Sequence, residues 1–566
     1  MEGNRWVNIG VQRFDRIREQ GAFYIDKTDF IREWWENGSE VTLIARPRRF
    51  GKTLNMSMVE CFFSNAYAQR GDLFKGLAIW KLEKYRQLQG TFPVIFLSFA
   101  KIKASSFEKM EYKITKVIAD LYERNSYLLT CGLLSDNEEK YYRSIEPGMG
   151  EEVAADAICS MANFMHRYYG RDVIIILDEY DTPMQEAWLG GYWEEAAEFF
   201  SSLFNSTFKT NPYLYKGLIT GVTRIARESI FTGMNNPDVI TVSSDEYATA
   251  FGFTEEEVFE ALDAAGYSAE KQEVRRWYDG FTFGMHTHIY NPWSIASFIR
   301  KHGKYDTYWA NTSSNELVNS LIQGGGADIK QAMEKLLQGE SIRAEVEEQM
   351  VFGQLDGNAH AIWSLLLVTG YLKVEKLERV GEFKRKVYTL ALTNMEVRSL
   401  FAGMVKGWFG GMAGNSYNNF IRALMLNDVD AMNEFMNKVA LQSFSSFDIA
   451  KGAAQEDAPE RFYHGFVLGL MVELEGRFRI TSNRESGFGR YDIMLTPVCR
   501  EKDCAYIIEF KVHKPLKEKD LGETVANALS QIEEKQYEAG LAAEGFSTKQ
   551  IKKYGFAFRG KECLIG

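Results

Sequence analysis

The stretch VTLIARPRRFGKTLNMSMVECFF, residues 41–63, decides how the N-terminal half of the chain is interpreted. Its first five residues are mostly apolar and rich in β-branched side chains, which predicts a buried strand, and residues 53–63 have a helical pattern. Between them, Gly51-Lys52-Thr53 matches the end of a phosphate-binding loop. Backbone N–H groups at a helix start can surround phosphates, the lysine can reach the terminal phosphates, and the hydroxyl can bind Mg²⁺.

This loop departs from the usual motif at its beginning. The motif's first glycine would fall at position 46, where the chain has Arg46-Pro47-Arg48-Arg49. We therefore predict that Arg49, Gly51, Lys52 and Thr53 bind a nucleotide, with Thr53 also a Mg²⁺ ligand. Hydrolysis of ATP is left open by Arg46.

Three further short apolar runs follow the first, at 93–99, 173–178 and 215–221. Each is too short for a buried helix and rich in β-branched residues, so we interpret each as a buried strand. Amphipathic helical segments separate them and are long enough to be crossovers between parallel strands. The pattern predicts an α/β domain whose parallel sheet is covered by helices on both faces.

Polar residues follow two of these runs at the point where a parallel sheet presents its ligand crevice. Asp178 and Glu179 end one strand: Asp178 would bind Mg²⁺, and Glu179 would orient and deprotonate the attacking water. The next strand ends in residues that could contact the γ-phosphate, the water or the transition-state charge, namely Thr220, Thr223, Arg224 and Arg227. The alternative is structural, because acids cap helices, threonine suits strands and arginine is common on surfaces.

Composition limits the possible functions. A length of 566 residues predicts about three to five domains, and 45% hydrophobic with 25% charged residues is typical of a globular protein. The net charge of −11 means that any nucleic-acid contact must be local. Six scattered cysteines indicate reduced thiols, and no signal peptide or run of about 18 apolar residues occurs. We expect a cytoplasmic protein with no membrane partner.

Residues 251–450 have mainly helical periodicity, with one exception at 361–394. There an apolar helix ends at Gly370 and two alternating strands follow, as in a winged helix. The predicted hairpin carries a cationic cluster, Lys376, Arg379, Lys384, Arg385 and Lys386. This cluster could contact nucleic acid or a partner subunit, or it could be an ordinary solvated hairpin tip.

Two strands near the C-terminus carry a second set of acids. Asp492 lies in one strand and Glu509-Phe510-Lys511 in the next, where alternation places 509 and 511 on one face. Two carboxylates make an oxygen-rich Mg²⁺ site, and Lys511 could activate the water that attacks a phosphodiester. Gln531, on the following helix, could brace this site. A salt-bridged edge strand is the alternative interpretation.

A helix before these strands carries Glu460 and His464 one turn apart, and Glu460 could supply a further acid. Its alternative is ordinary placement on a helix surface.

Several motifs together resemble a prokaryotic family in which an AAA-ATPase-like domain is joined to a C-terminal PD-(D/E)XK nuclease-superfamily domain. The motifs are YIDKTDFI (24–31), RPRRFGKT (46–53), LDEYDTP (177–183), TGVTRI (220–225), YDGF (278–281), YNPWSI (290–295), YWANTSSN (308–315), and SNRESGFGRYDI (482–493) with IIEFK (507–511). The resemblance covers nearly the whole chain. Within that family the loop often reads RPRRFGKT, so Arg46 is not peculiar to this protein.

The resemblance implies three domains. An ASCE-type P-loop domain would occupy 1–250, a helical lid with a winged-helix-like module 251–450, and a restriction-endonuclease-like α/β domain 455–566. We expect ATP and Mg²⁺ as cofactors, nucleic acid, DNA in the first instance, as the partner, and a homo-oligomer as one possible assembly. The leading hypothesis is a nucleotide-controlled nuclease. The alternative is a nucleotide-regulated switch or adaptor that binds without cleaving.

Overall fold

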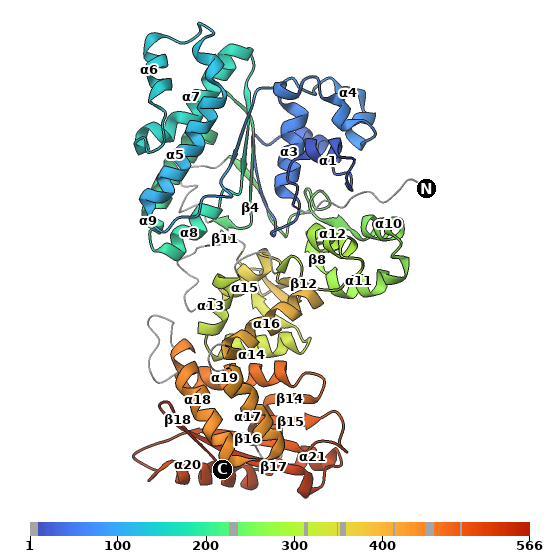
Figure 1. Ribbon diagram of the computed structural model, residues 1–566, viewed down its shortest axis with the longest axis vertical. Coiled ribbons are helices and arrows are strands. Elements are labelled where there is room, and N and C mark those ends of the chain that lie inside the picture. The colour runs from blue at the N-terminus through green and yellow to red at the C-terminus, as the bar shows by residue number, and fades with distance from the viewer. Residues whose placement is uncertain are drawn as a thin grey trace. The chain divides into compact units, whose positions relative to one another are not determined.

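The computed structural model describes residues 10–225, 236–310, 315–347, 349–350, 358–410, 414–447, 458–486 and 489–566. Its contacts divide the chain into two compact units, and Figure 1 shows the elements of each. Unit 1 comprises 1–312, 344–354 and 360–396, and unit 2 comprises 313–343, 355–359 and 397–566. The functional division at 250 and 455 stays a prediction.

A five-stranded parallel sheet forms the centre of unit 1, in the order β2-β3-β4-β1-β6. Its strands are β1 (Val41–Ala45), β2 (Val94–Ser98), β3 (Val173–Asp178), β4 (Leu214–Gly221) and β6 (Pro237–Ile240). Every residue of β1 and β3 is buried, as the apolar runs predicted. Only β6, four residues long, was not anticipated. The α/β fold class is therefore confirmed for this unit.

Long helices connect these strands and cover the sheet, with α3 on one side and α5 and α7 on the other in Figure 1. They are α3 (Lys52–Phe63), α5 (Phe107–Arg124), α7 (Glu151–Tyr169), α8 (Thr182–Gly190) and α9 (Trp193–Phe204). Because parallel pairing places all strand ends with the same sense at one edge, the P-loop, the end of β3 and the end of β4 meet there.

Residues 253–310 form a second module of unit 1. Its helices are α10 (Glu255–Ala265), α11 (Lys271–Tyr278) and α12 (Pro292–Arg300), packed around an aromatic core that includes Tyr278, Tyr290 and Phe298. Its three strands, β7 (Phe253–Thr254), β8 (Phe281–Phe283) and β9 (His286–Tyr290), form a small sheet that the helical pattern did not predict. Strands of two to five residues are too short for alternation to reveal them.

The helix followed by a hairpin is confirmed. Helix α15 (Ala359–Val368) ends before Gly370, whose φ of 89° suits glycine, and β12 (Leu372–Val380) pairs antiparallel with β13 (Arg385–Leu392). In the sheet, β10 (Ile342–Glu345) lies beside β13. The middle of the chain is therefore mainly helical with one long hairpin.

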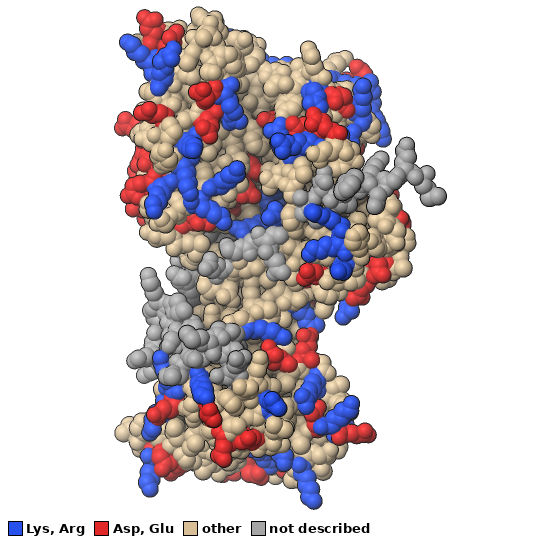
Figure 2. All heavy atoms as spheres, viewed as in Figure 1, with Lys and Arg blue, Asp and Glu red and all other residues tan. Residues whose placement is uncertain are grey.

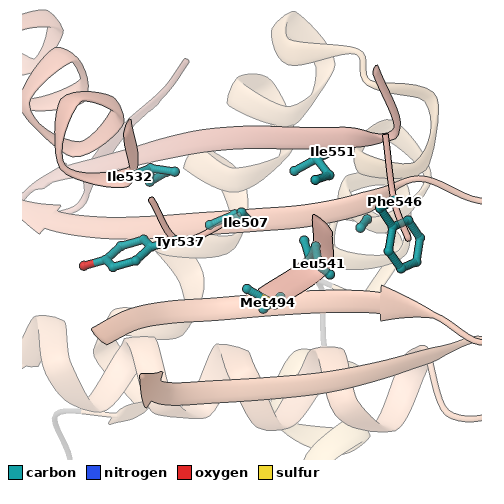
Figure 3. Close-up of a cluster of buried hydrophobic side chains, with 8 residues drawn as sticks. Met494, Ile507, Ile532, Tyr537, Leu541, Phe546 and Ile551 are labelled. Carbon is teal, nitrogen blue, oxygen red and sulfur yellow. The ribbon is translucent and has the colours of Figure 1, made fainter. Parts of the chain in front are cut away.

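Unit 2 contains the second α/β fold, a sheet in the order β14-β15-β16-β17-β18 in which only β16 and β17 pair in parallel. Its elements are α19 (Ala458–Glu473), β14 (Phe478–Ser486), β15 (Gly489–Pro497), β16 (Ala505–Val512), α20 (Leu521–Glu534), α21 (Ala539–Ala543), β17 (Ile551–Arg559) and β18 (Glu562–Ile565). Figure 3 shows the core between this sheet and its helices, where Ile507, Ile532 and Tyr537 are buried.

Helices from earlier in the chain complete unit 2. They are α13 (Glu316–Gly324), α14 (Ala327–Leu337), α16 (Met395–Gly410), α17 (Gly414–Leu426) and α18 (Val429–Phe447). On α18, the side-chain amides of Asn433 and Asn437 each bond a backbone N–H and carbonyl of β18, at Ile565 and Cys563. These contacts satisfy backbone groups that an edge strand would otherwise leave open.

Glu396 is a fully buried carboxylate at the last residue of unit 1. It accepts hydrogen bonds from the Ser294 hydroxyl (2.8 Å) and from the backbone N–H groups of Trp309 (2.7 Å) and Ala310 (3.4 Å). Burial raises its pKa to about 7, although these hydrogen bonds favour the charged form. The folded protein therefore retains a proton on Glu396 that the unfolded chain releases.

We expect the stability of unit 1 to fall as pH rises from the ordinary carboxyl pKa of 4.5 to about 7, because only the unfolded chain ionises freely in this window. The contribution of Glu396 to the loss is at most about 3 kcal/mol. Glu396→Gln should lack this decline, since an amide can accept the backbone bonds and donate to Ser294. Urea unfolding at pH 5 and pH 8 measures the difference, and equal pH dependence in both proteins would contradict it.

Candidate functional site

The P-loop joins β1 to α3 and brings together the predicted phosphate-binding residues. Gly51 is the N-cap of α3 with a φ of 80°, a left-handed conformation that glycine tolerates. The buried ammonium of Lys52 donates to the carbonyls of Arg46 (2.9 Å) and Pro47 (2.8 Å). Burial lowers its pKa, against the attraction of nearby carboxylates, of which Glu179 is the strongest. The loop backbone thus holds Lys52 in place.

Asp178 links the P-loop to two strands of the sheet. Its Oδ2 accepts a hydrogen bond from the Thr53 hydroxyl (2.8 Å), and its Oδ1 accepts one from the Thr220 hydroxyl (2.7 Å). Burial raises the pKa of Asp178. The two residues predicted to bind Mg²⁺, Thr53 and Asp178, are therefore in direct contact, which is the arrangement needed if both are to hold one cation.

Arg46 occupies the position of the motif's first glycine, yet its side chain is directed to the segment after β6. Its completely buried guanidinium donates to the carbonyls of Thr241 and Glu246 (3.2 Å to the latter) and lies 4.4 Å from the centre of the Phe283 ring. The arginine thus ties the P-loop to neighbouring elements.

The second module forms a wall along the rest of the loop. The Asn291 amide donates to the Arg48 carbonyl (3.2 Å), and the Arg49 guanidinium stacks on Trp293 with 4.3 Å to the ring centre. Phe50 packs edge-on against Phe281 with ring centres 4.8 Å apart. Residues 241–293 thus help to hold the P-loop at residues 46–50.

The residues after β3 hold the turn after β4. Glu179 has a φ of 53° and accepts from Thr182 at 3.2 Å. The Tyr180 hydroxyl donates to the Thr223 carbonyl (2.9 Å). Asp181, which is buried and has a pKa raised by burial, accepts from the backbone N–H of Val222 (2.9 Å) and from the N–H and hydroxyl of Thr223 (2.8 Å each).

These contacts refine the sequence interpretation of the turn. The Thr223 hydroxyl, predicted to contact the nucleotide, donates to Asp181 in this structure, whereas Thr220 contacts the predicted Mg²⁺ ligand Asp178. The side chain of Arg224 and the whole of Arg227 lie outside the described residues. The sequence reasoning did not select Tyr180 or Asp181, although the acidic run LDEYD was the available signal.

The structure places Asp492 beside the E-x-K strand. Asp492 on β15 accepts a hydrogen bond from the Phe510 N–H of β16 (2.7 Å). Gln531 joins the other residues: its amide oxygen accepts from the Lys511 ammonium (2.6 Å), and its NH₂ donates to Glu509 and to the Tyr537 hydroxyl (3.0 Å to the latter). Lys511 lies 3.8 Å from Glu509. Gln531 thus braces both residues of the E-x-K motif.

Glycine in β17 lets α20 carry Gln531 this close to the sheet. A Cβ at Gly555 would lie 2.9 Å from the Val525 carbonyl oxygen and 3.0 Å from the Ala528 Cβ. Gly555 pairs with Glu509 in the parallel ladder, so the close approach occurs beside the acid.

The charge balance of this centre fits a divalent cation. Glu509 is only 3% exposed, and its Oε2 is buried without a hydrogen bond to any described residue. Burial, then repulsion from Asp492, raises its pKa to about 8, while Lys511 opposes the shift. Burial also raises the pKa of Asp492. A buried and a half-buried carboxylate, with one unsatisfied oxygen between them, form a donor set that Mg²⁺ would suit.

A neighbouring polar network connects this centre to an earlier helix. The Tyr463 hydroxyl donates to the Asp492 carbonyl (2.6 Å), and the adjacent buried His464 lies 3.3 Å from the Glu334 carboxylate of α14. The sequence reasoning missed Glu334, because it precedes His464 by 130 residues. The side chain of Glu460 lies outside the described residues.

A further group of possible metal ligands, Glu255, Asp279 and His288, lies within unit 1. Arg275 lies among them, with its Nε 3.3 Å from Glu255 and 3.8 Å from Asp279. A cation already compensates the carboxylates, so we interpret the group as an ion-pair network.

The two sites and folds define a chain with a P-loop α/β domain and a second α/β domain carrying a D…E-x-K centre. Residues 8–231 match the family described as predicted AAA-ATPase, and residues 458–566 match the PD-(D/E)XK nuclease superfamily. The chain thus has an AAA-ATPase-like domain at its N-terminus and a PD-(D/E)XK nuclease-superfamily domain at its C-terminus, which confirms the resemblance.

Two individual proteins are also similar. A protein of Azotobacter chroococcum mcd 1, described as an uncharacterized protein in the vnfD 5′ region, is 26% identical over 394 residues, covering 69% of this chain and 68% of that protein. The ORC2 protein of Aeropyrum pernix, solved in ADPNP–ADP complexes, is 11% identical and covers 71% of this chain and 97% of its own. Its TM-score of 0.23 is too low to support a conclusion. A search of the described helices finds none that is long and apolar enough to cross a membrane.

We expect Asp181→Ala to loosen the turn at 221–223, because three buried donors would lose their acceptor. The local cost should be about 2 kcal/mol or more, whereas Thr223→Val, which removes one of the three donors, should cost about 1 kcal/mol. Hydrogen exchange at Val222 and Thr223 measures both effects. Unchanged protection in Asp181→Ala would show that the turn is held by other contacts.

Proposed function

We propose that the N-terminal domain binds ATP with Mg²⁺, and that its nucleotide state controls cleavage of nucleic acid by the C-terminal domain. The observation that carries the nuclease assignment is the buried, unsatisfied Glu509 Oε2 beside Asp492 and a braced Lys511. The matches to an AAA-ATPase family and a nuclease superfamily support the two halves.

At the nucleotide site, each residue has a separate task. Lys52 would neutralise the terminal phosphates. To do so, its ammonium would leave the carbonyls of Arg46 and Pro47 and bind phosphate oxygens instead. Thr53 and Asp178 would hold Mg²⁺, which would neutralise phosphate charge when bound. Glu179 would accept a proton from the attacking water. The buried direction of the Arg46 side chain supports hydrolysis, because the guanidinium is engaged with carbonyls beyond β6.

Lys52→Ala should lower ATP affinity by about 100-fold or more, because it removes the ammonium that the P-loop would place on the phosphates. Glu179→Gln should bind ATP almost normally but lose at least about 100-fold in turnover. Calorimetry measures binding and phosphate release measures turnover, with the exposed Lys81→Ala as a control. If Lys52→Ala bound ATP with wild-type affinity, the P-loop would not be the ATP-binding site. Binding without turnover by the wild type would favour the switch.

In the C-terminal domain, Asp492 and Glu509 would hold Mg²⁺, which would polarise the scissile phosphate when bound. The role of Lys511 is to orient and help deprotonate the attacking water. Gln531 keeps the ammonium and the Glu509 carboxylate at a fixed separation, so its contribution is positioning.

Asp492→Asn or Glu509→Gln should reduce Mg²⁺-dependent cleavage at least about 100-fold, and Gln531→Ala about 10- to 100-fold. Lys511→Ala should lose turnover more than metal affinity. A gel assay on single-stranded, duplex and junction DNA and on RNA, with and without ATP, measures cleavage, and retained ATP binding controls for folding. Wild-type cleavage by Asp492→Asn would assign the activity to another site. A wild type that cuts no substrate would favour the adaptor.

The net charge of −11 means that nucleic-acid contact outside this centre must be local. On the face shown in Figure 2, Lys and Arg are interspersed with Asp and Glu. The β12–β13 hairpin is one candidate. Of its cluster, Lys376 lies 3.0 Å from Glu378 and Arg385 lies 3.6 Å from Glu345, while Phe383 at the tip is 88% exposed.

Reversing the charges of Lys384, Arg385 and Lys386 together should weaken oligonucleotide binding and reduce its salt dependence. Fluorescence anisotropy over a salt series measures both quantities. If neither changes, the hairpin is an ordinary solvated tip.

A further inference from the structure

The loop at 513–519, which we call the β16–α20 loop, begins two residues after Lys511 and has a fixed conformation. The His513 N–H donates to the Phe558 carbonyl of β17 (2.8 Å). The N–H groups of Lys517 and Glu518 both donate to the Lys514 carbonyl (2.9 Å each), which closes a tight turn. A loop with its own turn and an anchor on the sheet presents its side chains in defined directions.

A single carboxylate organises this loop from inside. Glu518 Oε2 accepts from the Lys514 N–H (2.8 Å) and the Thr524 hydroxyl (2.9 Å), and its Oε1 accepts from the Asn527 amide (3.0 Å). The Lys514 hydrogen bond is the main reason that the pKa of Glu518 falls to about 2. The Thr524 and Asn527 contacts hold the Glu518 carboxylate on the side of the loop that faces α20.

The outer side of the loop carries cations and an apolar residue. Lys514, Lys517 and Lys519 are exposed, and their ammonium groups form no ion pair or hydrogen bond with another described residue. Leu516 is 100% exposed. The acids at the start of α20 are used by the backbone: Asp520 accepts from the Glu523 N–H (3.0 Å), and Glu523 accepts from the Lys519 N–H (2.6 Å).

The position of the loop favours a polyanion that passes the metal centre. Lys514 is three residues from Lys511, so their Cα atoms lie at most about 11 Å apart. Because a nucleic-acid strand carries one phosphate per about 3.4 Å of helix axis, a phosphate at Lys514 would lie within a few nucleotides of the cleaved bond. Free ammonium groups supply the charge complementarity, and an apolar side chain among them can contact a sugar or a base.

We propose that the β16–α20 loop is the surface that holds the nucleic-acid strand beside the nuclease centre, with Lys514, Lys517 and Lys519 on phosphates and Leu516 against a sugar or base. Glu518 is a positioning residue that keeps these side chains outside. This inference rests on the proposed nuclease function and adds the residues that bind its substrate.

The test uses the full chain and compares two variants of equal charge change with their parent protein. All the proteins in the binding test carry Glu509→Gln, so that binding is measured without cleavage. The loop variant is Lys514→Gln with Lys517→Gln and Lys519→Gln. The control changes three other exposed lysines of unit 2, as Lys502→Gln with Lys535→Gln and Lys549→Gln. Anisotropy of labelled single-stranded and duplex oligonucleotides is recorded from about 50 to 200 mM salt.

The loop variant should bind about tenfold or more weakly, and the slope of log affinity against log salt should decrease by about two to three. The control should keep both values. Leu516→Ser should weaken binding with no change of slope, because it removes an uncharged contact. Glu518→Ala should weaken cleavage while accelerating hydrogen exchange in the loop, whereas Mg²⁺ affinity stays at the wild-type value.

Equal losses in the loop and control variants would overturn the proposal, because they would report net charge alone. A wild-type salt slope in the loop variant would overturn it as well. Cleavage that is lost in Asp492→Asn but kept by the three-lysine loop variant without Glu509→Gln would then leave the nuclease function standing. A wild type that binds no oligonucleotide refutes the loop assignment. Loop-dependent binding of polyglutamate in place of oligonucleotide would assign the surface to an acidic protein segment.

Discussion

The buried carboxylate of Asp178 is the interaction on which the organisation of unit 1 depends. A charge at the carboxyl end of a buried strand is costly unless it is hydrogen-bonded, and its two oxygens are satisfied by hydroxyls of Thr53 and Thr220. Those partners lie on α3 and β4, so one side chain fixes the P-loop, the β3 end and the β4 end relative to one another. The residues proposed to bind a nucleotide therefore converge at one edge of the sheet.

The second module and the segment after β6 also belong to this site, because both contact the P-loop. Arg46 reaches past β6, Phe50 packs on Phe281, and the Arg48 carbonyl accepts from Asn291. These contacts hold the P-loop in one conformation, whereas a glycine-rich loop would be more flexible. Glu396 extends the network, since it ties α12 to the backbone at Trp309, close to where the chain passes into unit 2.

Unit 2 also contains a buried carboxylate, that of Glu509, but its hydrogen bonds satisfy only one of its two oxygens. Gln531 satisfies one oxygen of Glu509 and the ammonium of Lys511, while Glu509 Oε2 has no protein partner among the described residues. An unsatisfied buried acid costs stability, and a bound cation would recover that cost. Nearby, Glu518 is fully satisfied and serves to shape a loop. Glu509 therefore has an oxygen that a ligand could bind, whereas Glu518 has a structural role.

The sequence by itself determined the local features: the buried parallel strands, the Gly51-Lys52-Thr53 helix start and the hairpin after Gly370. These follow from periodicity, turn residues and strand ends, which act over a few residues. The tertiary structure alone decided where Arg46 points, what Asp181 holds, and that Glu334 of a distant helix meets His464. Such contacts join segments far apart in the chain, and many pairings satisfy the same local pattern, so only the packed fold selects one.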